Sequence, residues 1–152
     1  MSADPTSELT AHLGYWLRFV SNHVSQAFAR KVEARGVTVA EWVVMRDLFD
    51  AEAMAPSRLA ARIGMTRGAI TKLADRLVAK ELMTRTADPT DGRAQTLALT
   101  PAGRALVPEL AALADANDSE FFGALTPEDR AALTRILRGI VERRGLTRVP
   151  VD

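Results

Sequence analysis

The sequence predicts a mainly α-helical fold with one small β-hairpin near the middle of the chain. Three observations predict it. Apolar residues recur at helical spacing over most of the chain, and the turn Gly64-Met65-Thr66 joins two short helical patterns. A threonine-rich stretch, residues 85–100, carries the turn sequence Asp-Pro-Thr-Asp-Gly between its two halves. The length of 152 residues fits one ordinary domain, or a small module joined to an association module.

Two helices are predicted in the first third of the chain. The first runs over about residues 8–34, where Arg35-Gly36 supplies a C-terminal stop. The second follows Thr38 and covers residues 41–49, and a short connection leads on to the third helix.

Local signals also delimit the third and fourth helices. Pro56 fits the first turn of the third helix, because its missing N–H would be unpaired there, and this helix ends at Gly64. Thr66 is a good N-cap for the fourth helix, which reaches about Lys80. The residues predicted to pack inward from the fourth helix are Ile70, Leu73, Leu77 and Val78.

The hairpin and two further helices complete the prediction. Strands are expected near residues 83–87 and 95–99, and Thr100-Pro101 begins a long helix that ends near Phe122. Thr126-Pro127-Glu128 opens the last helix with an N-cap, a first-turn proline and an early acid. The predicted segments are 1–36, an N-terminal helix; 37–100, the helix-turn-helix with its hairpin; 101–145, the C-terminal helices; and 146–152, a tail.

Composition excludes several classes of protein. The 47% of apolar residues suffice for a core, but no apolar run approaches the roughly 18 residues that a membrane span needs. Cysteine is absent, which excludes disulfides, thiolate zinc sites and cysteine redox sensing. The polar N-terminus is unlike a secretory signal, so we expect a cytoplasmic protein without a membrane partner.

The net charge of +1 conceals a basic segment. Residues 56–95 contain eight basic and four acidic side chains, a balance of +4, which leaves −3 for the rest of the chain. Charge concentrated on one module is the footprint of a phosphate-binding surface, and the alternative interpretation is a solvated face. The basic residues are Arg58, Arg62, Arg67, Lys72, Arg76, Lys80, Arg85 and Arg93.

A helix, a tight turn, a second helix and a hairpin together predict a winged helix-turn-helix. The hairpin resembles the wing of the multiple antibiotic resistance regulator (MarR) family, in which Asp-x-Arg precedes Leu-Thr at fixed spacing. Asp91, Arg93, Leu99 and Thr100 match that pattern. The resemblance implies a DNA-binding transcriptional regulator whose terminal helices interleave into a symmetric dimer. Glu81 departs from the family pattern, which has glycine there.

The fourth helix has the features of a helix that binds in the major groove of DNA. The arginine of the hairpin has the features of a second DNA contact. The helix offers donors along one side, and small residues that let its backbone approach DNA. By resemblance, Arg93 enters the minor groove or grips a nearby phosphate. Asp91 would hold Arg93 or Arg76 in position, unless it is a plain turn residue. The predicted DNA-binding residues are Thr66, Arg67, Gly68, Thr71, Lys72, Arg76 and Arg93.

The first helix carries a set of ring-bearing side chains in one narrow sector. His12, Trp16, Phe19 and His23 follow helical spacing and predict one wall of a pocket for a small aromatic or phenolic effector. Dimer and core packing is the alternative interpretation. Trp42 and Met45 of the second helix would complete the pocket.

No metal site, cofactor motif or catalytic constellation is predicted, since two histidines eleven residues apart make a poor metal site. The sequence therefore predicts a homodimeric repressor that binds double-stranded DNA and is released by a small effector, rather than an enzyme. A ligand-independent regulator and a winged-helix protein-interaction module are the alternatives. The apolar residues expected to need a second copy for burial are Leu133, Leu137, Ile140 and Val141.

Overall fold

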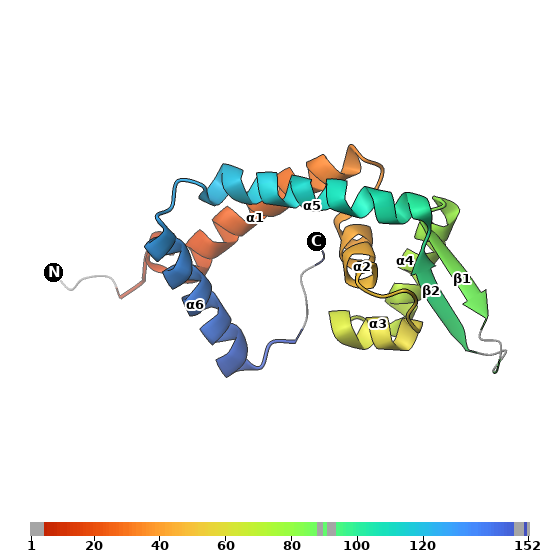
Figure 1. The fold of residues 1–152 in the computed structure, drawn as a ribbon. Helices are drawn as coiled ribbons and strands as arrows, with labels where there is room; N and C mark the ends of the chain where they lie inside the picture. The colour runs from red at the N-terminus through yellow and green to blue at the C-terminus, as the bar shows by residue number, and fades with distance from the viewer. Residues whose placement is uncertain (1–4, 88–89, 91–93, 148–150, 152) are drawn as a thin grey trace.

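The computed structural model describes residues 5–87, 90, 94–147 and 151 (Figure 1). The elements, in chain order, are η1 (Leu9–Ala11), α1 (Leu13–Glu33), α2 (Val39–Phe49), α3 (Pro56–Ile63), α4 (Arg67–Ala79), β1 (Met83–Ala87), β2 (Gln95–Leu99), α5 (Pro101–Phe122) and α6 (Pro127–Arg144). The mainly helical fold class with a two-stranded wing is thereby confirmed. Within the described residues, no helix has both the length and the apolar character needed to cross a membrane.

We call α1, α5 and α6 the arm. Helices α1 and α5 lie side by side, and α6 turns back from the end of α5 (Figure 1). The buried side chain of Asn117 links the first two, because its Oδ1 accepts from Lys31 Nζ at 2.8 Å and its Nδ2 donates to the Val24 carbonyl at 3.2 Å. Among the described residues, α6 contributes no buried side chain, so its apolar positions stay partly exposed in the single chain.

We call α2, α3, α4, β1 and β2 the lobe, and it contains most of the core. β1 and β2 pair antiparallel, with Met83 opposite Leu99 and Ala87 opposite Gln95. Met54 forms an isolated antiparallel β-bridge with Leu97 of β2. The Met54 N–H donates to the Leu97 carbonyl at 2.9 Å, and the Leu97 N–H donates to the Met54 carbonyl at 2.8 Å. The largest fully buried apolar side chains of the lobe are Val44, Met45, Leu48, Leu59, Ile70, Leu77, Met83 and Leu97.

Two details differ from the sequence prediction. The first helix is interrupted at His12, whose extended φ and ψ of −96° and 127° separate η1 from α1. Val78 was predicted to pack inward and is instead exposed. The buried positions of α4 are 70, 73, 74 and 77, and at about 100° per residue Val78 lies about 40° outside the edge of that stripe, on the side of Ala74.

Candidate DNA-binding interface

Helix α4 is held against the lobe by one face and a well-formed start. Helix α3 ends at Gly64, whose left-handed φ of 78° turns the chain, and Thr66 then caps α4 by accepting from the Ala69 N–H at 3.1 Å. Ile70, Leu73, Ala74 and Leu77 form the inward stripe of α4. The opposite face is therefore presented outward on a fixed helix.

The outward face of α4 is exposed and carries free cations. Arg67, Lys72 and Arg76 have no ion-pair partner within the part of the chain that the structure describes, whereas the Thr71 hydroxyl donates to the Arg67 carbonyl at 2.9 Å. Guanidinium and ammonium groups beside a helix N-terminus are suited to phosphate oxygens and to base acceptors of a major groove. The predicted residues on this exposed face are Thr66, Arg67, Gly68, Thr71, Lys72 and Arg76.

Among the described residues, four basic side chains of the lobe form ion pairs within it. Arg62 donates twice to Asp47, at 3.0 and 3.2 Å, and this hydrogen-bonded contact raises the pKa of Arg62 above its ordinary value. Arg85 of β1 contacts Asp75 of α4 at 2.7 Å. Arg46 and Lys80 are the other two.

Four other basic side chains of the lobe form no ion pair with any residue that the structure describes. Because they lie on α3 and α4, the basic surface of the lobe is on these two helices. The four side chains are Arg58, Arg67, Lys72 and Arg76.

A buried carboxylate fastens the end of α4, and sequence reasoning missed it. Glu41 is fully buried, and Lys80 Nζ donates to its two oxygens at 2.9 and 2.8 Å and to the Gly36 carbonyl at 2.9 Å. Glu41 also forms a capping box with Thr38 at the start of α2. The Thr38-x-x-Glu41 spacing signals such a box, but its pairing with Lys80 joins positions far apart in the sequence.

The chain leaves α4 through a strained residue. Glu81 has a left-handed φ of 61°, so glutamate occupies a backbone conformation that favours glycine. The Thr100 hydroxyl donates to the Glu81 carbonyl at 2.7 Å, and the Thr100 N–H donates to Leu82 O at 3.1 Å. A Cβ at Gly103 would lie 2.2 Å from that same Leu82 oxygen, so α5 needs glycine to begin this close to the wing.

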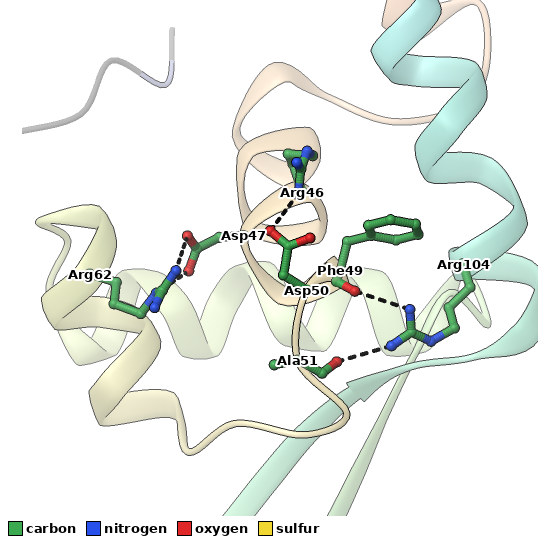
Figure 2. A network of polar contacts seen from close by, with 7 residues as sticks. All are labelled: Arg46, Asp47, Phe49, Asp50, Ala51, Arg62 and Arg104. Carbon is green, nitrogen blue, oxygen red and sulfur yellow. Dashed lines mark hydrogen bonds and ion pairs between the residues drawn. The ribbon is translucent and has the colours of Figure 1, made fainter.

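The first turns of α5 also secure the end of α2. Arg104 donates to the carbonyls of Phe49 and Ala51 at 3.1 and 3.0 Å, and its guanidinium lies 5.4 Å from the centre of the Phe49 ring (Figure 2). A cation at these free carbonyls complements the end of a helix. Helix α5 thus holds both α2 and the entry to the wing.

The wing strands are described, but the predicted contact residues at the tip are not. Asp91 and Arg93 lie outside the described residues, and their roles stay predictions. The last pair that the structure describes is Ala87 with Gln95.

The six predicted effector residues are not brought together in this chain. His12 is exposed just before α1, and Trp16, Phe19 and His23 are exposed on it, with the Phe19 and His23 rings stacked 5.4 Å apart. Met45 lies in the core. Only Trp42 borders a pocket of about 310 Å³ between α1, α2 and α5. The residues lining this pocket are Val24, Ser25, Phe28, Val39, Trp42, Val43, Ala114, Asn117, Asp118 and Phe122.

The arm exposes two apolar faces. Leu13, at 82% exposed, and Trp16 are the most prominent of those on α1. Exposed apolar patches are typical of surfaces that bind another protein, a membrane or a ligand. The exposed apolar residues of α6 are Leu133, Ile136, Leu137, Ile140 and Val141.

Comparisons with known proteins agree with this geometry. Residues 37–94 match the model of the MarR family. The HTH-type transcriptional repressor MdtR of Bacillus subtilis (strain 168) is 28% identical to this chain, over 80% of this chain and 79% of MdtR.

Two solved structures share the fold over nearly their whole length. One concerns the regulation of DNA binding of Bordetella bronchiseptica BpsR by 6-hydroxynicotinic acid; it has a TM-score of 0.77 and 27% identity over 89% of this chain and 96% of that one. The other is CouR from Rhodococcus jostii RHA1 bound to p-coumaroyl-CoA, with a TM-score of 0.75 and 26% identity over 89% of this chain and 95% of that one.

Proposed function

Because this chain is a winged helix-turn-helix transcriptional regulator of the MarR family, we propose that it represses genes by binding a pseudo-palindromic operator as a homodimer. The observation that carries the proposal is the exposed face of α4, whose cations have no ion-pair partner in the described part of the chain. Two such helices, related by a two-fold axis, would enter successive major grooves about 10 bp apart. The site of action would be the cytoplasm.

Each side chain has a distinct role in this proposal. Arg67, Thr71 and Lys72 contact bases or the backbone next to them, and Arg76 contacts a phosphate. Arg93 from the wing inserts into the minor groove or grips a phosphate beside it, and Asp91 positions it. The thermodynamic signature of this arrangement is an affinity that falls steeply with salt.

The homodimer would form through the arm. The exposed apolar faces of α1 and α6 support it, since a second copy of the same faces would remove both from water. Two lobes carried on one dimeric arm would also fix the distance between the two α4 helices.

A small aromatic effector would release the DNA. The pocket between α1, α2 and α5 supports this, because it lies where the arm meets the lobe. BpsR and CouR are similar proteins that respond to or bind aromatic ligands. An effector that binds more tightly to a dimer with wrongly spaced α4 helices lowers the affinity for the operator by the same factor.

The test is a titration of DNA from directly upstream of the gene with the protein at several salt concentrations. We expect specific binding, and Arg93→Ala and Lys72→Met should each weaken it and reduce the salt slope by about 1. Arg30→Ala, which removes an exposed arginine of α1, is the matched control and should leave the slope unchanged. Salt-independent binding, or equal behaviour of wild type and Arg93→Ala, would refute the operator proposal and favour a protein-interaction module.

A further inference from the structure

The pocket between α1, α2 and α5 has aromatic walls. The rings of Phe28 and Trp42 meet edge to face with their centres 6.4 Å apart, and Phe122 contributes a third ring. A volume of about 310 Å³ suits a single-ring molecule with a short substituent. Aromatic walls favour an aromatic ligand through edge-to-face and stacked contacts.

The polar side chains that line the pocket differ in how many of their hydrogen-bonding groups remain open to a ligand. Asn117 accepts from Lys31 and donates one of its two side-chain N–H groups to the Val24 carbonyl. Asp118 accepts from Arg130 of α6 through Oδ2, at 2.6 Å, and it is the only ionisable residue among those lining the pocket. The charged group that the described lining offers is therefore a carboxylate, which accepts hydrogen bonds and donates none, whereas Ser25, Trp42 and Asn117 carry only neutral donors.

The cations around the pocket are already paired. Lys31 contacts Glu120 at 2.6 Å, and Arg130 contacts Asp118. A second hollow shares Trp42 and Val43 with this pocket, and its two arginines are also engaged: Arg46 with Asp50 at 2.9 Å and Arg62 with Asp47 (Figure 2).

An incoming carboxylate would meet Asp118 and would have to break an existing pair to find a cation. Without a free cation, only the neutral donors of the lining would compensate the loss of hydration of that carboxylate.

We infer that this pocket takes an aromatic ligand that carries a hydrogen-bond donor and no negative charge, and that Asp118 discriminates against aromatic carboxylates. The inference rests on the proposed function, because it assigns the chemical class of the effector. A hydroxyl or an ammonium group can donate to the oxygen of Asp118 that Arg130 leaves open, and a ligand carboxylate cannot.

Three phenols of nearly equal size test this selectivity by isothermal titration calorimetry. They are tyrosol, which is neutral; tyramine, which is a cation; and 4-hydroxyphenylacetate, which is an anion. We expect tyrosol and tyramine to bind at least about tenfold more tightly than 4-hydroxyphenylacetate, the difference that a charge-assisted hydrogen bond supplies. Quenching of Trp42 fluorescence in a Trp16→Phe background locates the binding, since the chain has two tryptophans.

Two variants shift the selectivity in opposite directions. Asp118→Asn removes the carboxylate and frees Arg130, so tyramine should bind about tenfold more weakly and 4-hydroxyphenylacetate more tightly. Arg130→Met leaves Asp118 unpaired and should strengthen tyramine binding. Asp115→Asn makes the same chemical change on an exposed part of α5 outside the pocket lining, and should leave the three affinities unchanged.

The outcomes separate this inference from the proposed function. Equal affinities, a preference for the carboxylate, or no binding in the millimolar range would each overturn the inference, whether or not the protein binds DNA. A protein that shows the predicted selectivity but no salt-dependent DNA binding would keep the ligand class and refute the operator proposal.

Discussion

At the scale of single residues, the most consequential side chain is the buried carboxylate of Glu41. Two polar groups donate to it: the Lys80 ammonium and, through the capping box, the backbone N–H of Thr38. A charge in the interior is tolerated only with such partners, because its loss of hydration is otherwise uncompensated. The pair therefore fixes the end of α4 to the corner between α1 and α2.

Removing the partner of that carboxylate should be costly. We expect Lys80→Met to lower the free energy of unfolding by about 3 kcal/mol, because it strands a buried charge. Urea denaturation at neutral pH measures it. Arg35→Met breaks the exposed pair with Glu109 and is the control; its loss should stay under about 1 kcal/mol. Similar small losses in both variants would contradict the role assigned to Glu41.

Glu81 is strained, and the strain can be relieved. Replacing it with glycine at φ 61° should raise the free energy of unfolding by about 0.5–1 kcal/mol, since the gain in backbone energy exceeds the added freedom of the unfolded chain. Ala79→Gly, two residues earlier in α4, should instead cost about 1 kcal/mol. Thermal denaturation of both variants compares them, and a destabilised Glu81→Gly variant would show that Glu81 is held by more than its backbone.

At the scale of elements, α4 illustrates how stability and binding can conflict. Gly68 lies in its first turn, and a Cβ there would meet only the Thr66 hydroxyl, at 4.0 Å. Glycine is thus not required by packing. It leaves the backbone of α4 bare on the face proposed to approach DNA.

Gly68→Ala should therefore separate the two properties. We expect the unfolding free energy to rise by up to about 1 kcal/mol, because alanine is the better helix former, while operator affinity falls because the methyl group keeps the helix from the groove. Calorimetric melting and a DNA titration on the same preparation measure both. Gly14→Ala, in the open first turn of α1, is the control and should leave operator affinity unchanged; unchanged affinity of Gly68→Ala would remove Gly68 from the interface.

Local signals predicted the elements well, whereas contacts distant in sequence escaped prediction. The caps at Thr66, Thr100 and Thr126 each act within three residues, so the sequence alone locates the helix starts. The pairing of Lys80 with Glu41 and the lining of the pocket depend on how α1, α2, α4 and α5 pack. The β-bridge between Met54 and Leu97 also joins residues far apart in the sequence, and it was not predicted either.

At the scale of the whole molecule, the arm leaves apolar side chains of α6 exposed in the single chain. Helix α6 has no buried side chain among its described residues, yet it carries a row of exposed leucine, isoleucine and valine. A helix of this kind is stabilised chiefly by packing its apolar face. The proposed dimer supplies that packing.

A charge on this face should break the dimer. We expect Ile140→Asp to give a monomer in light scattering and to weaken binding to a full operator at least about a hundredfold, because the two lobes lose their shared attachment. Ala131→Asp is the control, since nine residues of helix place it on the opposite side of α6 and it should stay dimeric. A dimeric Ile140→Asp variant would refute the role of α6.

The internal ion pairs of the lobe have a consequence for how quickly such a regulator finds its site. Arg62, Lys80 and Arg85 are engaged with Asp47, Glu41 and Asp75, so they release few counterions when the lobe meets random DNA. Non-specific residence depends on that release, and a genome offers millions of competing sites. Keeping these three cations occupied would shorten each stay at a wrong sequence and leave discrimination to the cations that α4 presents.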